Sequence, residues 1–505
     1  MPSKDRPWIA RDGPYQDLTN GLCMSDPRLS QPDVKLLELG ISWENRDVKI
    51  RAIEFGKAQD DQILLSPISG PDALARCLAR ERPDGKARRT AYIFEGMNRD
   101  VATVLGDHFQ MHPSMFIIYE RTANAASRSE GSYSMLATSL ATQTYLCMSY
   151  RELVTLPSEL LGYFSFRCSA TGRDVSITRV NGKFDPVAMV RRKCIVWNRT
   201  RQDGWDCIVI CDPPLRNVTV TDKGPTRGCS FPACAKPTRG YVDFLPADIQ
   251  AKTLQGPPRT SMADDMCFYL ATHSTLPGLT WETPEIVAIF AKKIIASLYA
   301  RHFDHLRTTV IRSQLPMRRQ SDFMGLELAA VESNWSDCQT LEKRLSKCCL
   351  DLEELLIQLQ LPLERPNPGQ ITSWREVGAD FQMLYHQFNY ARNWTEKINS
   401  SITGLAGIAG NRQAFREQQL SLQAADRARN ITTIGLVFVP LAYVATLFSM
   451  SEEYAPGGEK FWLYFAISIP TTLFVLVAYQ CANWIGKRYE RGIWIPFMAR
   501  LNRMT

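Results

Sequence analysis

The sequence predicts an α+β membrane protein with a cytosolic α/β domain, a long helical stalk and two C-terminal transmembrane helices. Strand-like and helix-like segments mix in the first half, long helical patterns follow, and two uncharged apolar runs lie near the C-terminus. The chain before these runs is longer than one compact domain usually is. We expect five regions: a variable N-terminal region (1–85), the α/β domain (86–280), a long-helix and stalk region (281–430), the transmembrane helices (431–485) and a basic cytosolic tail (486–505).

The first 280 residues carry the signals of a mixed domain. Up to residue 85, Pro and Gly are scattered and periodicity is weak, so we expect little ordered structure there. The runs RRTAYIFEG, CIVWNRT and GWDCIVICDPP predict strands because they are rich in β-branched, aromatic and other apolar residues. The segment RDVATVLGDHFQM predicts a short helix that Pro113 stops. Residues 216–260 are rich in Gly, Pro and Thr, which is typical of a long surface loop.

Long helices dominate the sequence after this loop. Pro284 suits the first turn of a helix, and an apolar residue at every fourth position predicts one buried face: Ile286, Phe290, Ile294 and Leu298. A second helix is expected over 325–361, where leucines form an apolar seam before Pro362. A third begins near Ser373 and continues, through a weak point at 404–410, into the first apolar run.

The two apolar runs, 431–450 and 461–485, contain no Asp, Glu, Lys or Arg. Each reaches the length of about 20 residues that a helix needs to cross a bilayer's hydrocarbon core. Basic residues flank the pair on both outer sides, whereas the loop 451–460 carries one lysine against three glutamates. The positive-inside rule therefore puts both termini in the cytosol and the loop on the opposite side. The start of the chain is charged and lacks a secretory signal's apolar segment, so we expect the N-terminal part to stay cytosolic.

Composition and isolated motifs point away from nucleic acids and from enzymes. The net charge of +7 reflects this topology in part, and no basic-aromatic motif favours nucleic-acid binding. No catalytic-triad order, phosphate loop or nucleotide fingerprint occurs, so we expect neither an enzyme nor a cofactor. The fourteen cysteines are interpreted as free thiols. No dedicated metal site is predicted, because pairs with ligand-like spacing lack further ligands: Cys229 with Cys234, His108 with His112, and His302 with His305.

Small residues follow one side of the first apolar run, at steps of four and three: Gly435, Val439, Ala442, Thr446 and Ser449. The neighbouring stripe is mostly bulky: Ile434, Phe438, Leu441, Ala445 and Phe448. The small face can approach symmetry-related helices or line a narrow water-filled path, and the bulky face suits lipid or the second span. The same pattern also lets the two helices of a simple anchor pack closely, and the sequence leaves that alternative open.

These features together resemble the CorA-type divalent-cation transporter superfamily, and most closely its filamentous-fungal CorA-like members. The resemblance is strongest over 410–485, where ITTIGLVFVPLAYVATLFSM looks like the family's pore helix with its mid-span Pro440, and FWLYFAISIPTTLFVLVAY looks like its second span. A weaker likeness covers RRTAYIFEG, LGDHFQMHPSMF and GWDCIVICDPP. Where the family has Gly-Met-Asn at the outer end of the first span, this chain has Ser449-Met450-Ser451. A literal Gly96-Met97-Asn98 follows a predicted strand and is interpreted as a coincidence.

The resemblance implies a homopentamer in the lipid bilayer, with five copies of the first span around one axis and hydrated divalent cations, magnesium above all, passing between them. The pore mouth would be formed by Ser449, Met450 and Ser451. The pore wall would be formed by Gly435, Val439, Ala442 and Thr446. In the adjoining loop, Glu452 and Glu453 would concentrate cations at the mouth. The alternative is a non-conducting, membrane-anchored regulatory or scaffold protein that kept the fold and lost conduction with the signature.

Overall fold

The computed structural model describes most of the chain and divides it into two compact units, Met1–Leu405 and Ala406–Thr505. The sequence-based boundaries at 85 and 280 fall inside the first unit. The described residues are 9–25, 46–56, 63–80, 88–120, 140, 143–156, 166–180, 183–202, 204–220, 227–230, 241, 244, 261–272, 281–319, 328–449, 458 and 460–490.

The first unit is built on a ten-stranded sheet. Its order is β10-β9-β5-β6-β7-β8-β3-β1-β2, and β4 also pairs with β7. The central pair β3 and β8 is parallel, whereas the other pairings are antiparallel. The strands are β1 (Lys49–Glu54), β2 (Leu64–Ile68), β3 (Arg88–Glu95), β4 (Tyr145–Thr155), β5 (Phe166–Cys168), β6 (Asp174–Val180), β7 (Lys183–Arg201), β8 (Gly204–Cys211), β9 (Asn217–Val220) and β10 (Arg227–Ser230).

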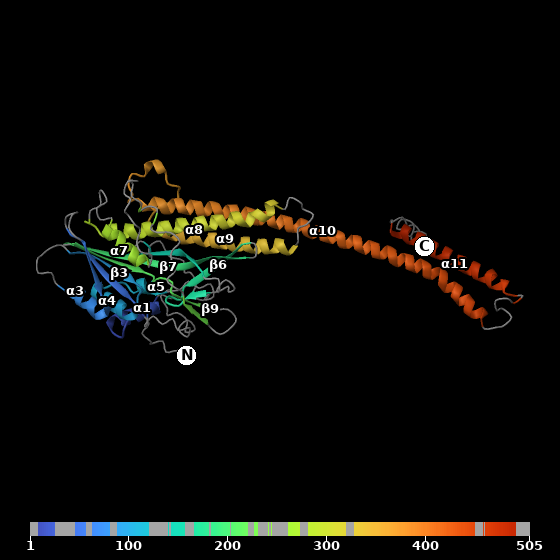
Figure 1. The fold of residues 1–505 in the computed structure, drawn as a ribbon, viewed down its shortest axis with the longest axis horizontal. Coiled ribbons are helices and arrows are strands. Elements are labelled where there is room, and N and C mark those ends of the chain that lie inside the picture. Colours follow the sequence, from blue (N-terminus) through green and yellow to red (C-terminus); the bar gives the residue numbers. More distant parts are fainter. Residues whose placement is uncertain are drawn as a thin grey trace, which may run out of the picture. The chain divides into compact units, whose positions relative to one another are not determined.

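Helices cover both faces of this sheet, with α1, α3, α4 and α5 on one side and α7, α8 and α9 on the other (Figure 1). The mixture of a mainly antiparallel sheet with long helices is an α+β arrangement. The helices of the first unit are α1 (Pro14–Ser25), α3 (Gly70–Ala79), α4 (Arg99–Phe109), α5 (Ser114–Glu120), α7 (Met262–Thr272), α8 (Glu285–Arg319), α9 (Leu328–Gln358) and a 3₁₀ turn at Pro368–Gln370. Helix α10 (Val377–Phe448) begins in the first unit and continues in the second, which also contains α11 (Trp462–Glu490).

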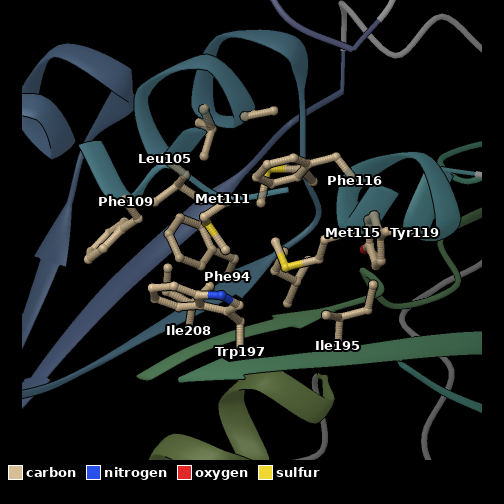
Figure 2. Close-up of a cluster of buried hydrophobic side chains, with 14 of the residues drawn as sticks. Phe94, Leu105, Phe109, Met111, Met115, Phe116, Tyr119, Ile195, Trp197 and Ile208 are labelled. Carbon is tan, nitrogen blue, oxygen red and sulfur yellow. The ribbon is translucent and has the colours of Figure 1, made fainter. Parts of the chain in front are cut away.

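A hydrophobic core lies between the sheet and helices α4 and α5 (Figure 2). Alternate residues of β3, β7 and β8 point to this side, and the rings of Phe109 and Trp197 meet edge to face with their centroids 5.2 Å apart. Asn98 fixes the start of α4, because its side chain accepts a hydrogen bond from the Val101 amide, and Gln110 ends the helix in the left-handed conformation. The core residues drawn in the close-up include Phe94, Leu105, Met111, Met115, Phe116, Ile195 and Ile208.

Most of the predicted elements are confirmed. The strands expected at RRTAYIFEG and GWDCIVICDPP are β3 and β8, CIVWNRT lies in β7, and the short predicted helix is α4. The long helices after residue 283 are α8, α9 and α10. Helix α10 runs unbroken through the glycines of 404–410 and past Pro440, so the expectation of one helix from the first unit to the apolar run is confirmed.

Two expectations about irregular structure are wrong. The first 85 residues contain α1, β1, β2 and α3, and β1 is an interior strand paired with both β2 and β3. Residues 216–260 were expected to form a long loop, but they contain β9 and β10, which form one edge of the sheet. In both cases pairing with a neighbouring strand determines the structure of a segment whose own sequence signal is weak.

A buried ion pair ties the sheet to the end of α5. The Arg173 guanidinium donates to both carboxylate oxygens of Asp212, at 2.7 and 3.1 Å, and to the backbone carbonyl of Tyr119 at 2.7 Å. The Lys193 amide also donates to Asp212, at 2.7 Å. Burial by itself raises the pKa of the Asp212 carboxyl, but the guanidinium of Arg173 outweighs this effect and holds that pKa below its ordinary value. Both side chains are fully buried, so each depends on the other for charge compensation.

Asp212→Asn should therefore lower the stability of the first unit by about 3–5 kcal/mol, because it leaves the Arg173 charge buried and uncompensated. Denaturant titration of the purified full-length protein, followed by near-ultraviolet circular dichroism, measures this loss. The control is Asp100→Asn, which breaks the exposed ion pair with Arg11 and should cost no more than about 1 kcal/mol. Equal losses in the two variants would contradict a structural role for the buried pair.

Candidate pore-lining helix

The second unit contains the C-terminal part of α10 and all of α11. Two helices of the described chain are long and apolar enough to cross a membrane, one within Val377–Phe448 and the other at Trp462–Ala482. Only 6 % and 11 % of their apolar windows are buried inside the protein. The core helix of a water-soluble domain would be mostly buried, so both helices have the character of candidate membrane spans.

One side of α10 packs against α11. Val444 is only 4 % exposed, and the rings of Phe448 and Tyr464 have their centroids 6.2 Å apart. On α11 the buried side chains are the small polar ones, Ser468 and Thr472, which lie four residues apart and so on one face. Small side chains at such a contact let two helices approach closely. Val444 therefore marks the side of α10 that faces α11.

The stripe of small residues lies on the other side of α10. Ala442 and Thr446 are each two residues from Val444, which is about 200° around the helix. The side chain of Val439 is 68 % exposed, and a Cβ atom placed on Gly435 would meet nothing within 4 Å. The small-residue stripe is thus open in the described structure of one chain, with Gly435 half-buried and the other four residues exposed: Gly435, Val439, Ala442, Thr446 and Ser449.

The bulky stripe lies between these two sides. Leu441 and Phe448 are partly buried and lie close to Val444 around the helix, whereas Ile434 and Phe438 are 58 % and 65 % exposed. Large exposed apolar side chains on a candidate span suit contact with lipid. The three sides of α10 therefore differ in what they offer: a contact with α11, a bulky apolar flank and an open small-residue stripe.

Hydroxyl groups are the polar side-chain groups at the C-terminal end of the described stripe. Thr446 Oγ1 donates to the Ala442 carbonyl at 2.8 Å, and Ser449 Oγ donates to the Thr446 carbonyl at 2.9 Å. Each oxygen keeps lone pairs that can accept a hydrogen bond from water. The other predicted mouth and loop residues lie outside the described residues: Met450, Ser451, Glu452 and Glu453.

The side of α10 that carries the small-residue stripe can be followed toward the N-terminal end of the helix. Steps of three and four from Gly435 reach a face with one carboxylate and no Lys or Arg: Ile431, Ala428, Ala424, Leu420, Glu417, Gln413 and Gly410. Gln413 Nε2 donates to Glu417 Oε1 at 3.2 Å. Arg427 and Arg416 lie just outside this face, about 20° and about 40° from Leu420 at its edge. The sequence analysis missed Glu417, although extending the same spacing past the apolar run would have found it.

The part of the chain that the structure describes holds no cluster of three or more His, Cys, Asp or Glu side chains that could bind a metal ion. His112 Nδ1 lies 2.7 Å from Ser114 Oγ, and His302 is buried with Nε2 3.1 Å from Met189 Sδ. Cys229 lies in β10, whereas Cys234 is outside the described residues.

The literal Gly96-Met97-Asn98 has a structural role. Gly96 adopts a positive φ of 83°, and a Cβ atom there would lie 2.7 Å from the Asp47 carbonyl oxygen. Met97 is fully buried, and Asn98 caps α4. These three residues turn the chain from β3 into α4 and have no part in the apolar helices.

No family model and no curated protein matches this chain. Among solved structures, it aligns with the complete structure of the CorA magnesium transporter from Methanocaldococcus jannaschii. The alignment has 9 % sequence identity and a TM-score of 0.33, and it covers 85 % of this chain and 97 % of that one. So loose a superposition carries no functional argument.

Proposed function

We propose that this protein is a CorA-like membrane transporter or channel for divalent cations, with magnesium the favoured ion. The observation that carries the proposal is the open small-residue stripe on α10, which lies on the side away from α11. One pair of helices cannot enclose a path for ions, so a pore needs several copies around an axis. The number five, the choice of magnesium and the likeness to fungal members come from the family resemblance of the sequence.

Charge and size along the stripe suit a hydrated cation. No charged side chain lies between Ile431 and Ser449, so an ion inside this segment would keep its water shell. Glu417 on one side, and Glu452 and Glu453 on the other, would raise the local cation concentration. Under the proposed topology both termini are cytosolic, Glu417 lies toward the inner entrance, and the loop 451–460 lies at the outer one.

Ala442→Leu should abolish Mg²⁺ flux or disturb assembly, because the larger side chain fills the stripe where copies would meet. Ala445→Leu adds the same volume on the bulky flank and should leave flux close to that of the wild type. Flux is measured in proteoliposomes with an internal Mg²⁺ indicator, and native mass spectrometry in detergent reports assembly. A wild-type protein that is monomeric in detergent, or equal flux in the two variants, would remove the pore from this proposal.

The outer end of the stripe gives a gain-of-function test. The double substitution Ser449→Gly with Ser451→Asn should raise Mg²⁺ flux, because an Asn ring adds donors and acceptors that hold the water of a hydrated ion. The double variant is compared with wild type and with Ser449→Gly alone in the same proteoliposomes. If the assembled double variant stays inert and Ala442→Leu also changes nothing, the non-conducting scaffold alternative replaces transport.

Glu417→Lys should reduce Mg²⁺ flux by about tenfold at low ionic strength, because it reverses the charge that concentrates cations at the inner entrance. The reduction should shrink in physiological salt, where charges are screened over about 8 Å. Asp426→Lys makes the same charge change on the opposite side of α10 and is the matched control. Equal effects of the two substitutions, or an effect that is independent of salt, would reject a role for Glu417 in the cation path.

A further inference from the structure

Three arginines gather at one end of the sheet in the first unit, around the carboxylate of Asp206. Arg88 begins β3, and Arg199 and Arg201 lie at the end of β7. In register, Arg199 is opposite Asp206 of β8, while Arg88 and Arg201 are both opposite Gly204. Alternation along the strands therefore puts these side chains on one face of the sheet. We call Arg88, Arg199, Arg201 and the neighbouring His108 of α4 the arginine cluster.

The charges of this cluster are not balanced by Asp206. Arg201 Nη2 lies 2.8 Å from Asp206 Oδ2, and Arg88 Nε and Arg199 Nη2 each lie 3.9 Å from a carboxylate oxygen of the same residue. The side chain of Asp206 is 2 % exposed, whereas those of the three arginines are 23 %, 35 % and 42 % exposed. Among the described residues, one buried carboxylate thus faces three guanidinium groups that solvent reaches, and their charges sum to a net positive charge.

The neighbouring groups are consistent with this excess. The pKa of the His108 imidazole is lowered, first by burial and then by the positive charges of the three arginines. The negative charge of Asp206 opposes this shift only in part. Arg88 donates to the Tyr92 hydroxyl, and the Arg199 guanidinium lies 5.0 Å from the centre of the Phe109 ring. The C-terminal carbonyls of α4 carry partial negative charge and offset part of the cluster's charge. These carbonyls do not take the place of an anion bound between the guanidinium groups.

Several buried polar atoms here have no hydrogen-bond partner among the described residues. Two of these atoms are donors, Arg199 Nε and the hydroxyl of Thr90. Thr90 is the cross-strand partner of Asp206. The same set of atoms also includes both carboxylate oxygens of Asp206, which make ion pairs without hydrogen bonds. A ligand that fits must therefore present acceptor oxygens to the cations and a hydrogen-bond donor to Asp206.

We propose that the arginine cluster binds inorganic phosphate. Phosphate offers oxygens to the guanidinium groups and, at neutral pH, keeps an O–H that donates to Asp206. Sulfate has the same shape but no proton to donate, so Asp206 repels it. A phosphodiester of a lipid headgroup has no such proton either, and a phosphate monoester has mostly lost it at pH 7. Asp206 therefore selects free phosphate from these anions. The site does not depend on the proposed transport function.

Isothermal titration calorimetry on the purified full-length protein in detergent tests this assignment, with ionic strength held constant by NaCl. Phosphate should bind saturably at pH 7, and sulfate at least about tenfold more weakly, because it leaves Asp206 without a donor. Arg201→Gln should weaken phosphate binding by about tenfold through loss of a charge-assisted hydrogen bond. Arg11→Gln, which removes an exposed arginine from the pair with Asp100, should leave phosphate binding unchanged.

Three results would overturn the proposal: no saturable phosphate binding, equal affinity for phosphate and sulfate, or the same phosphate affinity in Arg201→Gln and Arg11→Gln. Circular dichroism of both variants establishes that they are folded. Phosphatidylglycerol, whose headgroup is a phosphodiester, should not displace phosphate when it is added to the same detergent solution. Displacement by this lipid would show that the cluster recognises a lipid headgroup and would reject selection of a protonated phosphate by Asp206.

Discussion

The rotational position of α10 is the constraint on which the second unit depends. A helix that spans a bilayer must pair its backbone amides within itself, so a segment with the apolar character of this candidate span has little freedom except to remain helical. It remains so through Pro440, and its residues therefore keep a fixed angular order from the stalk to Phe448. Contact with α11 through Val444 and Phe448 then determines which side is left open. The small-residue stripe is open because it lies opposite that contact.

Sequence patterns predicted the elements whose own residues specify them. Helices α8, α9 and α10 have apolar residues at helical spacing, and β3 and β8 are nearly continuous apolar runs, as strands buried on both faces should be. β1 was missed because it alternates with charged residues over only six positions, KIRAIE. Its place beside β3 is set by tertiary contacts, in which Ile50 and Ala52 join the core next to Phe94 and Tyr92. Local propensity does not contain that information.

The candidate sites differ in the same way. The spacing from Gly435 to Ser449 lies within one helix and can be read directly from the sequence, whereas the side that faces α11 requires the contact of Phe448 with Tyr464. Glu417 was not predicted because it lies before the apolar run that begins at Ile431, and hydropathy alone does not mark it. The arginine cluster was beyond prediction, because strand order brings together residues from β3, β7 and α4 that are distant in sequence. Register, and not any motif, places them around Asp206.

The two units handle charge in opposite ways. In the first unit, buried charges are held by direct partners, as in the pairs Arg173–Asp212 and Arg192–Glu152. Those partners offset the cost of removing an ion from water, so buried charge there is fixed in place. Between Ile431 and Ser449 the second unit has no charged side chain at all. A cation moving along that stripe would find no ligand to replace its water and no partner to trap it. Under the proposed function, selection therefore belongs to the charged and hydroxyl-bearing ends of the path, and the uncharged middle favours release over binding.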